Sequence, residues 1–100
     1  MRVGRVVGKV TLNRAHPSLR GAVLKMVVPL SLDNLLGKLP AQAEELVVYD
    51  ETSSQEGCYL AFSEGREAAQ PFEEPKPIDA YAAAILDHIE IRPLPDRPAR

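Results

Sequence analysis

The chain has 100 residues, of which 45% are hydrophobic and only 5% aromatic, so we expect a single domain with an aliphatic core. Its 12 basic and 14 acidic residues give a net charge of −2, which offers no electrostatic reason to expect nucleic acid or an anionic membrane as a partner. The lone Cys58 cannot form an internal disulfide, and no apolar run has signal-peptide or transmembrane length. These features favour a soluble, cytoplasmic protein.

The first half of the chain predicts two strands and a loop-like arm. Residues 2–12 alternate along a strand, and their apolar face includes Gly4 and Gly8, which suit the sharp curvature of a small closed barrel. Residues 22–30 are rich in valine and predict a second strand. Residues 31–45 predict a short turn of helix or an ordered loop, because glycine and proline interrupt the leucine rhythm.

The second half begins with a compact apolar strand, residues 46–49. A polar turn over residues 50–57 leads to another apolar stretch, residues 58–62, and this pattern predicts a hairpin. Residues 70–76 predict an extended connector with two prolines. The last nine residues, 92–100, are proline-rich and charged, so we expect a disordered or extended tail after a domain of residues 1–91.

Residues 77–91 give the only clear helical pattern. Pro77 suits the first turn of a helix, and Asp79 places a negative charge near the positive end of the helix dipole. An apolar stripe recurs at helical spacing through Ile78, Ala82, Ile85, Leu86 and Ile89. The opposite face has Ala80, Ala83 and Ala84 and no charged residue, so we expect a neighbouring subunit to cover it. The helix should stop near residues 87–88, and residues 89–91 should form a short final strand.

Three motifs in order resemble the EutN/CcmL family of bacterial microcompartment vertex proteins. They are the opening strand with Gly8, the Pro17-Ser18-Leu19-Arg20-Gly21 turn, and the Lys76-Pro77-Ile78-Asp79-Ala80 segment that precedes the last apolar stretch. Two loops depart from the family pattern: residues 52–57 replace its Gly-Ala-Gly-x-Gly-Glu and keep one glycine, and residues 63–68 replace its Gly-Ser-Ser-Ala-Arg. The resemblance covers most of residues 1–91.

The resemblance implies a mainly β fold, an OB-like barrel with a short C-terminal helix and a final strand. It also implies a homopentamer that caps the vertices of a microcompartment shell, with hexameric shell proteins as its other partners. The expected subunit interface consists of Pro77, Ile78, Asp79, Ala80, Ala83 and Ala84. The loop near the symmetry axis of the family corresponds here to Ser63, Glu64, Gly65 and Arg66, which become the candidate pore loop.

Motifs for catalysis are missing from the sequence. It has no phosphate-binding glycine loop, no Cys-x-x-Cys, no His-x-x-x-His and no Gly-x-Ser-x-Gly, so we expect neither an enzyme nor a cofactor or metal site. The alternative function is an oligonucleotide- or ligand-binding module, since OB-like barrels also serve that purpose. Binding of single strands needs basic grooves with exposed aromatic rings, and the acidic net charge and five aromatic residues offer little of either.

Overall fold

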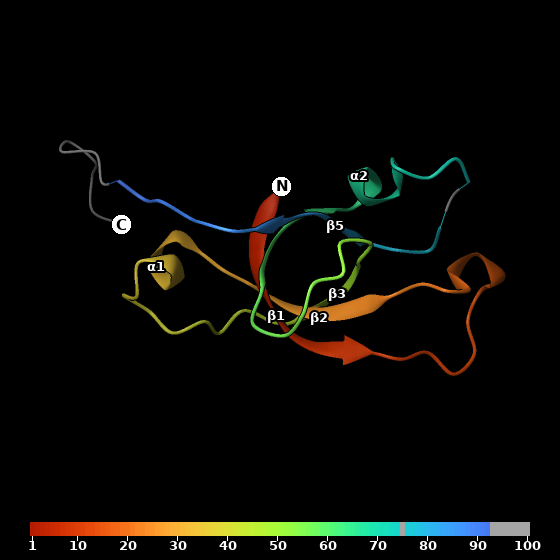
Figure 1. Cartoon of the computed structure of the whole chain (residues 1–100), viewed down its shortest axis with the longest axis horizontal. Helices are drawn as coiled ribbons and strands as arrows, with labels where there is room; N and C mark the ends of the chain where they lie inside the picture. The colour runs from red at the N-terminus through yellow and green to blue at the C-terminus, as the bar shows by residue number, and fades with distance from the viewer. Residues whose placement is uncertain (75, 93–100) are drawn as a thin grey trace.

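Five strands close into a small barrel in a computed structural model that describes residues 1–74 and 76–92. The strands are β1 (Arg2–Val10), β2 (Leu24–Pro29), β3 (Leu46–Tyr49), β4 (Tyr59–Glu64) and β5 (Ala80–Leu86), arranged in the order β1-β2-β3-β5-β4 (Figure 1). Neighbouring strands are antiparallel except β3 and β5, which meet in parallel at Tyr49 and Tyr81. The prediction of a mainly β protein built on a small OB-like barrel is confirmed.

The strand β1 pairs with β2 on one side and with β4 on the other, and it bends between the two pairings. Its first half, from Arg2 to Arg5, pairs with β4, while residues from Gly4 to Val10 pair with β2. The register shifts between Val6 and Gly8, which leaves Val7 as an extra residue in a bulge. The bulge interrupts the single apolar face expected for residues 2–12. Gly4 and Val6 are buried, whereas Gly8 and Val10 are only half-buried.

The barrel interior is aliphatic, as the composition predicts. Its core cluster consists of Val6, Val27, Val48, Leu60, Phe62, Ala80 and Ala82, each at most 1% exposed. Phe62 is the largest of these side chains and occupies the interior from β4. Alanine from β5 faces the bulkier residues of β1 to β4, so large and small side chains share the narrow space.

Short helical segments connect the strands. A 3-10 turn, Pro17–Leu19, lies in the arm between β1 and β2, and α1 (Leu32–Leu35) follows β2 at the opposite end of the molecule (Figure 1). Ser31 caps α1 in a capping box with Asn34, which confirms a turn of helix in this segment. The helix α2 (Arg66–Ala69), which the sequence analysis did not predict, packs on β4 and β5 through the buried Ala68. None of the helices in the described ranges is long and apolar enough to cross a bilayer.

The predicted C-terminal helix is wrong, because residues 80–86 form β5. This strand pairs with β4 from Ala80 to Leu86 and contacts β3, so it closes the barrel. The preference of alanine for helix is worth less than about 1 kcal/mol per residue, which a full ladder of hydrogen bonds and buried alanines outweighs. Residues 89–91, predicted as the final strand, have no regular secondary structure. The predicted tail falls mostly on residues 93–100, outside the described residues.

The predicted hairpin is also wrong. Residues 46–49 and 59–64 are strands, but β5 lies between them in the barrel, so β3 and β4 are not paired. The polar segment 50–57 instead crosses the end of the barrel toward β1, where Gly57 donates a backbone hydrogen bond to Val6 O at 2.8 Å. Sequence adjacency favoured a hairpin, and barrel closure by the C-terminal strand overrode it.

Candidate functional site

The six residues predicted for the subunit interface divide between surface and core. Pro77 and Asp79 are exposed and Ile78 is half-buried, and all three lie in the approach to β5. Ala80 is fully buried and belongs to the core of its own chain. Ala83 and Ala84 are exposed on β5. The alanine face that the helix would have presented therefore does not exist.

A bulge in β5 explains which alanines are exposed. Ala82 pairs with Phe62 and Ala84 pairs with Ala61, so Ala83 is the extra residue. The bulge places three consecutive apolar residues at the surface, and Ile85, a member of the predicted apolar stripe, is 42% exposed. The outer side of β5 is apolar even though the helical pattern that suggested this was wrong.

The candidate pore loop lies at the end of β4 and the start of α2. Gly65 has a φ of +66° and precedes α2, and the Glu64 carboxylate pairs with Arg2 at 2.9 Å. The Gly65 N–H donates to Asp79 O at 2.8 Å, so the structure brings this loop beside the start of the predicted interface segment. Glu64, Gly65 and Arg66 are exposed and Ser63 is half-buried. The assignment of these four residues to a pore stays a prediction.

An apolar depression that the sequence analysis missed lies on the outside of the barrel. We call it the Val47 patch. It has a volume of about 360 Å³, its floor includes the buried side chains of Leu24 and Tyr49, and it is lined further by Leu12, Leu19, Leu46, Val47, Pro77, Ile78 and Asp79. Leu12 is 43% exposed and Val47 is 41% exposed. The signal was present in the sequence as an unbroken apolar run in β3, whose alternate residues must face outward.

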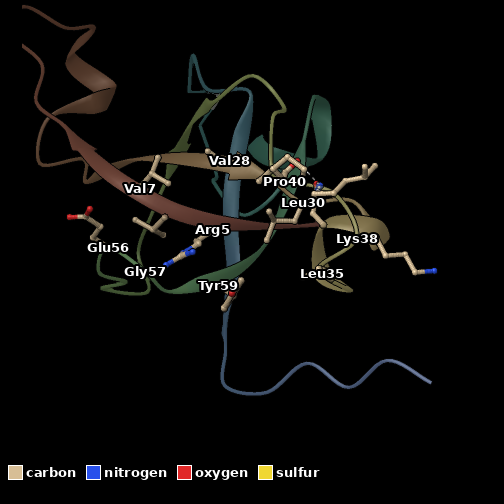
Figure 2. A pocket seen from close by; sticks show the side chains of 15 residues that line it. Arg5, Val7, Val28, Leu30, Leu35, Lys38, Pro40, Glu56, Gly57 and Tyr59 are labelled. Atoms are coloured by element: carbon tan, nitrogen blue, oxygen red, sulfur yellow. Dashed lines mark hydrogen bonds between the residues drawn. The ribbon is translucent and has the colours of Figure 1, made fainter. Parts of the chain in front are cut away.

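A larger groove, which we call the Tyr59 groove, separates β1 and β4 from α1 and the segment that follows it (Figure 2). Its volume is about 1000 Å³, and its walls include Arg5, Val7, Val28, Leu35, Lys38, Leu39, Glu56 and Tyr59. The Arg5 guanidinium lies 6.0 Å from the centre of the Tyr59 ring, in the range of a cation–π contact. A smaller hollow continues past Leu35 and Tyr59 to Leu86, Ile89 and Ile91.

The turn after β3 is held by one buried carboxylate. Asp50 is 2% exposed, and it accepts hydrogen bonds from the Ser54 hydroxyl at 2.6 Å and from the amides of Thr52 and Ser54 at 2.8 and 3.1 Å. The Thr52 hydroxyl donates to it as well. Burial raises the pKa of Asp50, but these hydrogen bonds outweigh burial and hold the pKa below its ordinary value. The carboxylate thus orders a loop that keeps only one of the glycines of the family pattern, Gly57.

Aromatic packing fixes the connector before β5. The rings of Tyr49 and Phe72 meet edge to face at 5.1 Å, and Tyr81 packs against both. The Lys76 ammonium lies 5.1 Å from the Phe72 ring centre and donates to the backbone oxygen of Ser18. Phe62 is in the core, so only Tyr59 remains outside these internal contacts, and the Arg5 guanidinium lies within cation–π range of its ring. The exposed aromatic row that single-stranded nucleic acid needs is therefore not formed by the described residues, and the oligonucleotide alternative is not favoured.

Residues with reactive side chains do not converge on a chemical site in the described part of the chain. No three His, Cys, Asp or Glu residues are grouped there as metal ligands would be. The His16 ring is hydrogen-bonded to Ser18, two residues along the chain, and the Cys58 sulfur accepts a hydrogen bond from the Gln55 amide. The features that stand out are two hollows on the outer wall, the apolar Val47 patch and the Tyr59 groove, whose lining mixes apolar and charged residues.

Comparison with known proteins gives a consistent answer. The family model described as ethanolamine utilisation protein EutN/carboxysome matches residues 1–87. The structure of CcmL from Gloeobacter violaceus is similar, with 27% identity and a TM-score of 0.77 over 91% of this chain and 90% of that one. GrpN, a pentameric microcompartment shell protein from Rhodospirillum rubrum, has 28% identity and a TM-score of 0.75 over 93% of this chain and 100% of that one.

CcmL from Nostoc sp. is similar too, with 26% identity and a TM-score of 0.76 over 89% of this chain and 92% of that one. No curated protein sequence matches the chain significantly. The family match spans all five strands and includes all three motifs that suggested the resemblance. The chain belongs to the EutN/CcmL family.

Proposed function

We propose that this chain is a structural shell protein that assembles into a homopentamer at the vertices of a bacterial microcompartment. The observation that supports this most directly is its likeness to GrpN, which is a pentameric shell protein and which the match covers over its entire length. The exposed apolar side chains that line the two hollows are consistent with it, since apolar side chains gathered on a surface often mark a contact with another protein.

The role follows from geometry. A closed shell made of six-fold tiles needs a five-fold unit at each vertex, and a small wedge-like subunit can supply it. The partners are then four further copies of this chain and the hexameric shell proteins around them, in a shell in the cytoplasm. The ring-forming unit is residues 1–91, and the role involves no catalysis and no cofactor.

Native mass spectrometry tests the proposal, because it counts subunits directly. We expect a dominant species of five chains at micromolar concentration. A monomer or a dimer as the dominant species would contradict the proposal. A hexamer would assign the protein to the shell facets instead of the vertices.

A further inference from the structure

We propose that the ring closes head to tail, with the surface around the Val47 patch of each copy packed against the surface around the Tyr59 groove of the next. The inference rests on the proposed function, which makes a second copy of the chain the occupant. It identifies the two surfaces that meet in the ring. Neither surface coincides with the alanine face expected from the sequence.

Symmetry requires two different surfaces. A two-fold dimer uses one patch twice, whereas a ring of five must join one surface to a second, unlike surface on the neighbour. The chain offers such a pair. The Tyr59 groove is built from β1, β4 and the α1 segment, and the Val47 patch from β3, the arm after β1 and the approach to β5. In Figure 1 the arm and α1 project from opposite ends of the molecule, as head and tail of a ring subunit would.

Exposed apolar side chains gather on these two surfaces. Nine large hydrophobic residues are exposed among the described ones, and five of them line one surface or the other. Val7, Leu39 and Tyr59 belong to the groove, and Leu12 and Val47 to the patch. Burying them against each other removes the apolar area that a free monomer would leave in water.

The charged residues of the two surfaces are complementary. Arg5 and Lys38 line the groove with Glu56 as their only acidic counterpart, whereas Asp79 is the only charged residue that lines the patch. Asp79 forms no ion pair with another described residue, so its carboxylate is free to face a cation of the neighbour. Tyr59 and Arg5 lie close together in the groove, and tyrosine and arginine are among the residues that most often anchor an interface (Figure 2).

The test uses two variants that each damage one surface. Tyr59→Glu places a carboxylate in the groove, and Val47→Glu places one on the patch; the two side chains are 37% and 41% exposed, so the barrel should tolerate both. Native mass spectrometry should find each variant monomeric, with at least a tenfold loss of the pentamer signal. An equimolar mixture should form a dimer with one chain of each kind, because only one intact groove and one intact patch remain to meet.

The outcomes separate this inference from the proposed function. Pentamers from either variant, or a mixture that stays monomeric while the unsubstituted chain forms pentamers, would overturn the head-to-tail assignment alone. Failure of the unsubstituted chain to form pentamers would contradict the function itself. Gln70→Glu adds the same charge outside both surfaces and should keep the ring. If circular dichroism shows a variant to be unfolded, Arg5→Glu replaces the groove variant and Leu12→Glu the patch variant.

Discussion

Replacing Gly4 by alanine should destabilise the barrel by about 1–3 kcal/mol, the usual cost of overpacking a full core. A Cβ added there would overlap Val27 Cγ1 outright and would lie 2.8 Å from Phe62 Cε1 and 3.1 Å from the carbonyl oxygen of Val28. Val27 and Phe62 have no exposed surface, and the branched valine side chain is stiff, so neither can turn away without disturbing other core residues.

Gly8→Ala in the same strand is the matched control. Its added Cβ would have Met26 Cβ as its nearest neighbour, at 3.7 Å, which is an ordinary van der Waals contact. Gly8 does not have a positive φ, so alanine fits its backbone. Removing a glycine then restricts mainly the unfolded chain, and we expect a change between zero and a gain of about 1 kcal/mol.

Thermal unfolding measured at one fixed protein concentration separates the two variants, since assembly makes the midpoint depend on concentration. For a domain of this size, 2 kcal/mol lowers the midpoint by roughly 8–16 °C. We therefore expect a large fall for Gly4→Ala and little change or a small rise for Gly8→Ala. Equal midpoints for the two variants would show that the barrel has room for a Cβ at Gly4, and the overpacking argument would be wrong.

Three further predictions concern other parts of the chain. The pKa of Asp50 is lowered in the folded state, so its contribution to stability is complete above the ordinary pKa of 3.8 and disappears as the pH falls through the lower folded pKa. Acid titration of the unfolding midpoint should show this loss. Asp50→Ala should abolish the pH dependence and leave the Ser54 hydroxyl without its hydrogen-bond acceptor. Ile85→Arg should leave the monomer folded by circular dichroism, because the side chain is 42% exposed, and an unfolded variant would refute the position of β5. A chain ended at Arg92 should keep its unfolding midpoint and its subunit count, and dissociation would show that the tail docks on a neighbour.

The amino-acid sequence by itself determined where most strands lie. The β-branched runs gave residues 46–49 as a strand with the bounds that the structure has, and gave β1 and β2 to within two residues at each end. The start of α1 could be located because Ser31 supplies a side-chain cap. These features depend on residues close together in the chain, and local propensity and hydrogen bonding are sufficient to set them.

The tertiary structure decided the rest, above all the last element. In isolation, residues 77–86 favour a helix, and the apolar stripe supports that reading. In the folded chain they complete a barrel whose open edges, β3 and β4, would otherwise leave unpaired backbone groups. The bulge at Ala83 and the exposure of Ile85 follow from that closure, and the approach to β5 contributes Pro77, Ile78 and Asp79 to the Val47 patch. Pairing between residues distant in the chain depends on which strand edges remain unpaired. A local pattern of side chains does not indicate which edges those are.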